Sequence, residues 1–126
     1  MFSKRNPQGR ITYPRNRGSV PRLFRAEGTI DDTPAGQHLV VAVEVAGLIW
    51  PKALVPADSG SWTCQVHEGG NPPSGRFALS LWLTGSQGYD EITAWLETGT
   101  RTGHYPGLWQ IKVGVKLHSI TLRLEA

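Results

Sequence analysis

The stretch RFALSLWLTGSQGYDEITAWLE, residues 76–97, places two apolar runs on either side of a glycine-containing turn. In the first run the apolar positions are Phe77, Leu79, Leu81 and Leu83. In the second run they are Ile92, Ala94 and Leu96. Alternation of apolar and polar residues with a period of two is typical of a strand with one buried face. The stretch therefore predicts a β-hairpin.

This predicted hairpin carries Trp82 and Trp95 on its outer face, because both are out of phase with the apolar positions. On adjacent strands, two such rings lie close enough to touch. Three interpretations stay open: a cross-strand pair that stiffens the sheet, a platform that stacks sugar rings or bases, and a protein–protein contact. A ligand platform would also include Arg76, Glu91, Thr93 and Glu97, whose mixed donors and acceptors suit sugar hydroxyls better than phosphate.

Other short runs with a period of two are separated by turns rich in glycine and proline, and we find no window with a sustained helical period. Residues 50–61 are expected to form a long connection, because Pro51 and Pro56 interrupt them. The chain is therefore predicted to be an all-β antiparallel sandwich of jelly-roll or immunoglobulin-like type, with six to seven strands. A barrel of the oligonucleotide-binding type is the alternative.

The last apolar segment changes phase at His118-Ser119 without losing its apolar character. Trp109, Ile111, Val113, Val115 and Leu117 share one phase, and Ile120, Leu122 and Leu124 share the other. A one-residue slip of this kind indicates a β-bulge. The segment is then one bent strand or two strands that pair continuously, and Leu117 and Ile120 both face the core. A tight turn at His118-Ser119 is the competing interpretation.

Basic residues are concentrated at the N-terminus of this 126-residue chain, whose net charge is +3. Residues 1–26 hold seven basic residues and no acid, whereas the rest holds six basic and ten acidic residues, a net charge of −4. Pro7, Pro14 and Pro21 oppose regular structure, so residues 1–21 are predicted to be a flexible arm before a single β domain of residues 22–126. The alternation of Ile11 and Tyr13 is compatible with a short edge strand.

The charge asymmetry indicates binding to nucleic acid or another anionic surface. The candidate contact residues are Lys4, Arg5, Arg10, Arg15, Arg17, Arg22 and Arg25. Lys112, Lys116 and Arg123 would extend this basic track if the last strand lies beside the arm. A solvated tail is the competing interpretation.

Motifs of catalysis and cofactor binding are missing from the sequence. It contains no G-x-S-x-G, no P-loop and no G-x-G-x-x-G. Cys64 and His67 have a C-x-x-H spacing, but residues three apart in a strand point to opposite faces, which disfavours a zinc site. We therefore expect a protein that is not an enzyme, with no catalytic residue, metal or cofactor.

The loop GTRTGHYPG, residues 99–107, is the strongest loop candidate for recognition, through Arg101, His104 and Tyr105. Its competing interpretation is a rigid turn in which Tyr105 caps the edge of the core. No apolar run is long enough to span a membrane, and no apolar stretch follows the basic N-terminus. A soluble, intracellular protein without a membrane partner is expected.

These sequence features are compatible with three functions. The first is nucleic-acid binding through the basic arm, as in a virion or mobile-element protein. The second is carbohydrate binding through Trp82 and Trp95. The third is assembly into a homo-oligomer in which the arm adds a strand to a neighbouring subunit.

Overall fold

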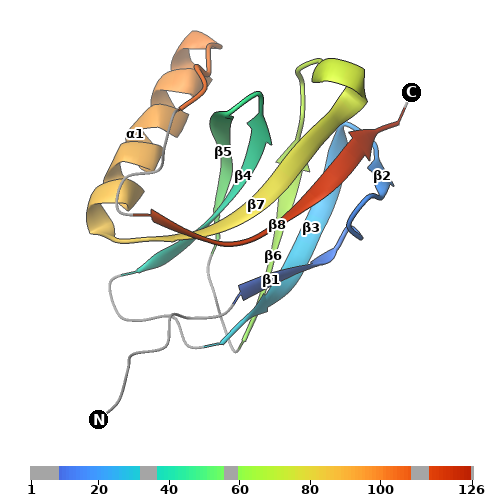
Figure 1. The fold of residues 1–126 in the computed structure, drawn as a ribbon. Coiled ribbons are helices and arrows are strands. Elements are labelled where there is room, and N and C mark those ends of the chain that lie inside the picture. The colour runs from blue at the N-terminus through green and yellow to red at the C-terminus, as the bar shows by residue number, and fades with distance from the viewer. Residues whose placement is uncertain (1–8, 32–36, 56–59, 109–113, 126) are drawn as a thin grey trace.

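A computed structural model describes residues 9–31, 37–55, 60–108 and 114–125, which are mostly strand (Figure 1). The strands are β1 (Gly9–Tyr13), β2 (Ser19–Val20), β3 (Leu23–Ile30), β4 (His38–Val45), β5 (Leu48–Val55), β6 (Ser61–His67), β7 (Arg76–Thr84) and β8 (Gly114–Leu124). One α-helix, α1 (Ser86–Thr102), and one short 3-10 turn, η1 (Pro73–Gly75), complete the described elements.

The strands form two sheets that face each other across the main core (Figure 1). The smaller sheet has the order β1-β3-β6 and is antiparallel throughout. The larger sheet has the order β2-β8-β7-β4-β5, and only the short β2–β8 pairing is parallel. The larger sheet curls strongly, as the long arcs of β7 and β8 show in Figure 1. The predicted all-β class is confirmed.

Strand β4 is buried on both faces over residues 39–43. Its residues Leu39, Val41 and Val43 face the smaller sheet, where they join the main core. Val40 and Ala42 point the other way and pack in a second cluster with Ile49 and Ile92. Because apolar residues occupy both faces of β4, this strand needs a covering layer on each side.

The covering layer on the outer side is α1, which lies over β4 and β5 (Figure 1). The predicted hairpin at residues 76–97 is therefore wrong in its second half: residues 76–84 form β7, but residues 86–102 form a helix. The buried positions of α1 are Gly88, Ile92 and Gly99, which follow a helical period. Two of the three are glycines, which add no apolar side chain to the pattern, so only the short alternation around Ile92 was visible.

Residues 50–55 were expected to belong to a long connection, and this prediction is also wrong. They belong to β5, which pairs with β4 at one edge of the larger sheet. Pro51 is compatible with this position because an edge strand has backbone N–H groups without ladder partners. A register shift between Val41 and Ala42 of β4 accommodates the proline.

The bulge predicted near His118-Ser119 is confirmed, one residue earlier. Strand β8 is continuous, and its register with β7 shifts so that Leu81 pairs with His118 and Trp82 pairs with Lys116. Leu117 is the extra residue between them. Leu117 packs against the main core and Ile120 is buried in that core, so both residues face the core as predicted.

Residues 9–20 belong to the folded body, and the prediction of a free arm does not hold for them. Strand β1 pairs with β3, and β2 pairs with β8. Ile11 and Val20 are both buried in the main core. Strand β1, which contains Ile11 and Tyr13, is an edge strand, as their alternation allowed. Residues 1–8 lie outside the described part of the chain.

A side-chain hydrogen bond joins β1 to β8 across the two sheets. The backbone N–H of Ile11 donates to Nδ1 of His118 at 2.9 Å. Burial, together with the nearby Arg10 cation, lowers the pKa of His118 below its ordinary value of 6.5. A protonated His118 has no free acceptor for this N–H, so the contact requires the neutral ring.

We predict that stability decreases as the pH falls below about 6.5, partly through His118. The folded pKa of this residue lies below the unfolded value, so the unfolded chain binds the proton more readily. The contribution of His118 to the free energy of unfolding is therefore complete above the unfolded pKa and is lost as the pH falls through the folded pKa. Urea denaturation of the wild type and of His118→Asn, which keeps an acceptor that does not titrate, should give midpoints that separate less at pH 7.5 than at pH 5. Equal acid sensitivity of the two proteins would exclude this role.

Candidate ligand-binding groove

A groove of about 810 Å³ lies at the side of the molecule where edge strand β5 approaches β6. Its other walls come from the loop after β6, residues 68–72, and from the C-terminal half of α1 with the segment that follows. Ligand sites in proteins are typically concavities of this size, with mostly apolar walls and a few well-placed polar groups.

Three aromatic residues form one wall of the groove. Trp50 comes from β5, Trp95 from α1, and Tyr105 from the segment after α1. The rings of Trp95 and Tyr105 pack with their centroids 5.3 Å apart and their planes tilted by 55°. The Nε1 of Trp50 donates to the backbone oxygen of Tyr105 at 2.9 Å, and the Nε1 of Trp95 donates to that of Pro106 at 3.0 Å. Both indole N–H groups are therefore engaged, and these bonds orient the rings.

A glycine in the helix creates the space that Tyr105 occupies. A Cβ atom added to Gly99 would lie 2.0 Å from Cε1 of Tyr105, well inside contact distance. Gly99 is buried, and the Tyr105 ring covers it. The hydroxyl of Tyr105 lies 3.1 Å from Oγ1 of Thr100, which fixes the outer end of the ring. The helix thus supplies the ring of Trp95 and, at Gly99, the surface against which the ring of Tyr105 packs.

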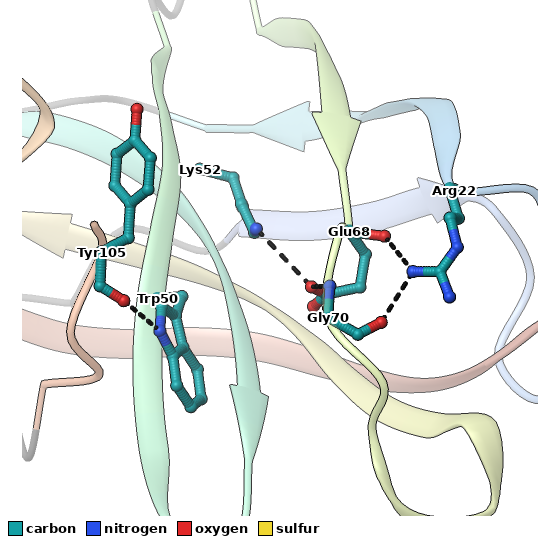
Figure 2. Close-up of polar contacts among 6 residues, drawn as sticks. All are labelled: Arg22, Trp50, Lys52, Glu68, Gly70 and Tyr105. Carbon is teal, nitrogen blue, oxygen red and sulfur yellow. Dashed lines mark hydrogen bonds and ion pairs between the residues drawn. The ribbon is translucent and has the colours of Figure 1, made fainter. Parts of the chain in front are cut away.

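The opposite wall is a loop organised by one arginine. The guanidinium of Arg22 donates to the backbone oxygens of Glu68 and Gly70 at 2.9 Å and 2.7 Å, and to Oδ1 of Asn71 at 2.8 Å. A backbone bond from the N–H of Glu68 to the oxygen of Arg22 adds to these contacts. Figure 2 shows the guanidinium bridging the two loop carbonyls. Arg22 therefore has a structural role in the groove.

A lysine and a glutamate lie between the two walls, with Trp50 on one side and Arg22 on the other (Figure 2). Nζ of Lys52 is 3.8 Å from Oε1 of Glu68, and this oxygen also accepts the N–H of Gly70 at 3.0 Å. Burial lowers the pKa of Lys52, and the Glu68 carboxylate partly offsets that effect. Gln65, His67 and Asn71 add further polar groups to the lining.

The structure separates the two tryptophans that were expected to lie side by side. Trp82 lies on β7, where its Nε1 donates to Oγ of Ser80 at 2.8 Å and Nζ of Lys116 lies 5.3 Å from its ring. Trp95 lies on α1 and faces the groove. Only Trp95 belongs to the aromatic wall, because the helix replaces the second strand on which the predicted pairing depended.

The other residues of the predicted platform are also dispersed. Arg76 begins β7, and Thr93 donates to the backbone oxygen of Tyr89 within the helix. Glu91 and Glu97 are exposed on α1. Of the predicted recognition loop, Arg101 lies in the last turn of α1 and His104 is exposed, whereas Tyr105 is part of the aromatic wall.

The basic residues of the N-terminal region do not gather in one place. Arg10 lies on β1, Arg15 and Arg17 lie between β1 and β2, and Arg25 lies on β3, where its Nε is 3.4 Å from Oε2 of Glu27. Arg22 is committed to the groove. Lys4, Arg5 and Lys112 lie outside the described residues.

The described residues contain no group of three or more histidine, cysteine or acidic side chains able to hold a metal ion. Burial raises the pKa of Cys64 to about 11, so its thiol stays protonated at neutral pH. No helix in the described ranges has both the length and the apolar character needed to cross a membrane.

Sequence reasoning missed Trp50, Lys52 and Glu68. The first two lie in the segment that was expected to be a connection, and Glu68 follows β6 in a glycine-rich turn. One signal was present: Trp50 and Lys52 flank Pro51, and proline within an apolar run is typical of an edge strand. An edge strand that contains Pro51 and pairs with β4 places Trp50 at the edge of the larger sheet.

Comparisons with known proteins concern the fold. No protein-family model matches this chain, and no curated protein sequence matches it. Among solved structures, the chain is similar to part of the endo-beta-1,4-mannanase from Thermotoga petrophila, with a TM-score of 0.52 and 14% identity over 98% of this chain. The matched region covers 20% of the mannanase chain, so the chain spans about a fifth of that protein.

We predict that Gly99→Ala displaces the Tyr105 ring and destabilises the protein by about 1–3 kcal/mol, the usual cost of an extra methyl in a packed site. The added carbon and the ring cannot occupy their present positions together. Denaturant unfolding of Gly99→Ala, Tyr105→Ala and the double variant measures the coupling. In the Tyr105→Ala background the extra methyl should cost nothing, because the ring it meets is gone. An equal cost in both backgrounds would contradict the proposed packing.

Proposed function

We propose that this chain is a non-enzymatic binding module that holds a carbohydrate chain in the groove beside β5. The observation that carries the proposal is the aromatic wall of Trp50, Trp95 and Tyr105 facing a polar wall with Lys52 and Glu68. Sugar rings have apolar faces that pack against aromatic rings and hydroxyl edges that need donors and acceptors. The groove offers both kinds of surface on opposite sides.

The polar wall suits a neutral ligand better than a charged one. Lys52 and Glu68 lie close enough to balance each other's charge, and burial of the lysine disfavours an uncompensated cation. Their remaining hydrogen-bonding positions, with the amides of Gln65 and Asn71, suit hydroxyl groups. A phosphate would be repelled by the Glu68 carboxylate.

Binding without hydrolysis is supported by the number of carboxylates. Glycoside hydrolysis ordinarily needs two carboxyl groups, about 5–10 Å apart, on either side of the scissile bond. Among the described residues that line the groove, Glu68 is the sole acid, and it accepts a backbone bond and pairs with Lys52. Without a second acid this arrangement is better suited to holding a sugar than to cleaving one.

The strand order supports a finer description of the fold as immunoglobulin-like. Such domains place strands A, B and E in one sheet and strands C, F and G in the other, and some add C′ beside C. The orders β1-β3-β6 and β5-β4-β7-β8 correspond to A-B-E and C′-C-F-G. In this description α1 occupies the connection between F and G, where such domains often carry binding loops.

The structural neighbour suggests which glycan to test first. The segment of similar fold occurs in an endo-beta-1,4-mannanase, although at 14% identity the likeness concerns architecture alone. We therefore propose β-1,4-mannan and its oligosaccharides as the first ligands, followed by other β-1,4-linked glycans.

We predict that Tyr105→Ala weakens glycan binding about tenfold and that Tyr105→Phe leaves it nearly unchanged. Losing roughly 60 Å² of ring contact at about 25 cal/mol per Å² costs about 1.5 kcal/mol, which corresponds to the tenfold change. The phenylalanine variant keeps the ring and loses only the hydroxyl contact with Thr100. Isothermal titration calorimetry with mannohexaose measures the affinities, and thermal melts verify that both variants fold.

Two results would count against the proposal. One is the absence of binding by the wild type to mannan, glucan and xylan oligosaccharides at millimolar concentration. The other is equal binding by Tyr105→Ala and the wild type, which would place any glycan site elsewhere on the surface. Release of reducing ends from a bound oligosaccharide would instead show that the chain is an enzyme.

A further inference from the structure

Helix α1 covers the outer face of the larger sheet over β4, β5 and the end of β7 that carries Trp82 (Figure 1). The other end of β7 and most of β8 and β2 extend beyond the helix, and several outward residues of β7 and β8 there are polar or basic. Ser119, Thr121 and Arg123 of β8 are exposed, and so is Arg76 of β7. This part of the sheet lies outside the groove, whose walls come from other elements.

Two arginines occupy directly opposite positions on this face. Arg76 and Arg123 are cross-strand partners in the antiparallel β7–β8 pair. Their neighbours Phe77 and Leu122 are also partners and are buried in the core, so both arginines point outward. Like charges placed directly opposite each other on a sheet are destabilising unless something neutralises them.

No described acid neutralises this pair. Neither guanidinium makes an ion pair or a hydrogen bond with any residue in the described ranges. Glu44, an acid on the same outer face, is engaged by Lys116, whose Nζ lies 3.0 Å from its Oε2. Glu125, two residues beyond Arg123, is exposed and forms no ion pair with it. The face therefore presents two opposed cations to an external anion.

Further basic residues border the same end of β8. The backbone N–H of Arg17 donates to the oxygen of Thr121, and the N–H of Arg123 donates to the oxygen of Gly18. These bonds hold the segment with Arg15 and Arg17, both exposed, along the edge of β8 that faces away from β7 and pairs with β2. Along β8, the hydroxyls of Thr121 and Ser119 lie between Arg123 and Lys116. The row from Arg123 to Lys116 is about 20 Å long at 3.3 Å per residue.

We infer that this face binds the phosphates of single-stranded nucleic acid, with Arg76 and Arg123 sharing one phosphate group. Guanidinium groups bind phosphate with paired hydrogen bonds, which a pair of opposed arginines can direct at one anion. A flexible single strand can follow a twisted sheet, and open sheet faces bind single strands in other proteins. The site is independent of the glycan groove and does not rest on it.

Binding of a fluorescein-labelled 20-nucleotide oligo-dT and of the matching oligo-U, followed by fluorescence anisotropy over a range of NaCl concentrations, tests the inference. The double variant Arg76→Gln/Arg123→Gln should bind about tenfold more weakly at 50 mM salt. The slope of log K against log salt should fall in magnitude by about 0.7, because the two arginines share one phosphate and single strands contribute about 0.7 for each phosphate neutralised. Both substitutions are on the surface, and thermal melts verify the fold.

Arg25→Gln is the matched control, because Arg25 is equally exposed but lies on the other sheet and already pairs with Glu27. Its affinity and salt slope should equal those of the wild type. The inference is overturned if the wild type binds neither oligomer, or if the double variant binds like the wild type. It is also overturned if Arg25→Gln loses as much affinity as the double variant, or if heparin binds while both oligomers do not.

Discussion

Burial of β4 on both faces is the constraint from which the arrangement of the other layers follows. Its inward residues, such as Val41, pack against the smaller sheet, and its outward residues, such as Val40, require a cover of their own. Each fully buried side chain of this size contributes about 1.5–3 kcal/mol when it is removed from water. The connection between β7 and β8 meets this requirement by forming α1, which places Ile92 over the outer cluster. The same helix then carries Trp95 to the edge of the sheet.

The groove is held open by contacts that do not involve a ligand. Arg22 fixes the loop on one side, Gly99 makes room for Tyr105 on the other, and the indole N–H groups of Trp50 and Trp95 are bonded to backbone oxygens. These contacts are paid for during folding, so a ligand entering the groove does not have to order the walls. Preorganisation of this kind raises affinity by lowering the entropic cost of binding.

Period-two patterning predicted much of the sheet structure and failed where glycines occupy buried positions or a proline interrupts a strand. The strands around Val41, Leu79 and Ile120 were readable because their buried positions carry large apolar groups. Helix α1 was not readable, since Gly88 and Gly99 occupy its buried face, and β5 was not, since Pro51 interrupts its alternation. The groove follows from both of these elements. Of its aromatic wall, Trp95 and Tyr105 were named from sequence but in the wrong arrangement, and Trp50 was missed.

The pairing of β2 with β8 and the bond between Ile11 and His118 join the two ends of the chain. The bonded residues are separated by 107 positions in the sequence. Closing so long a loop is entropically costly and slows folding relative to local contacts. During synthesis, β1 can pair with β3 early, but β2 has no partner until β8 has left the ribosome. Strand β8 therefore completes the larger sheet after β2 has been made and secures β2 in it, so that a chain truncated before β8 exposes the apolar side chains of Ile11 and Val20 to other proteins.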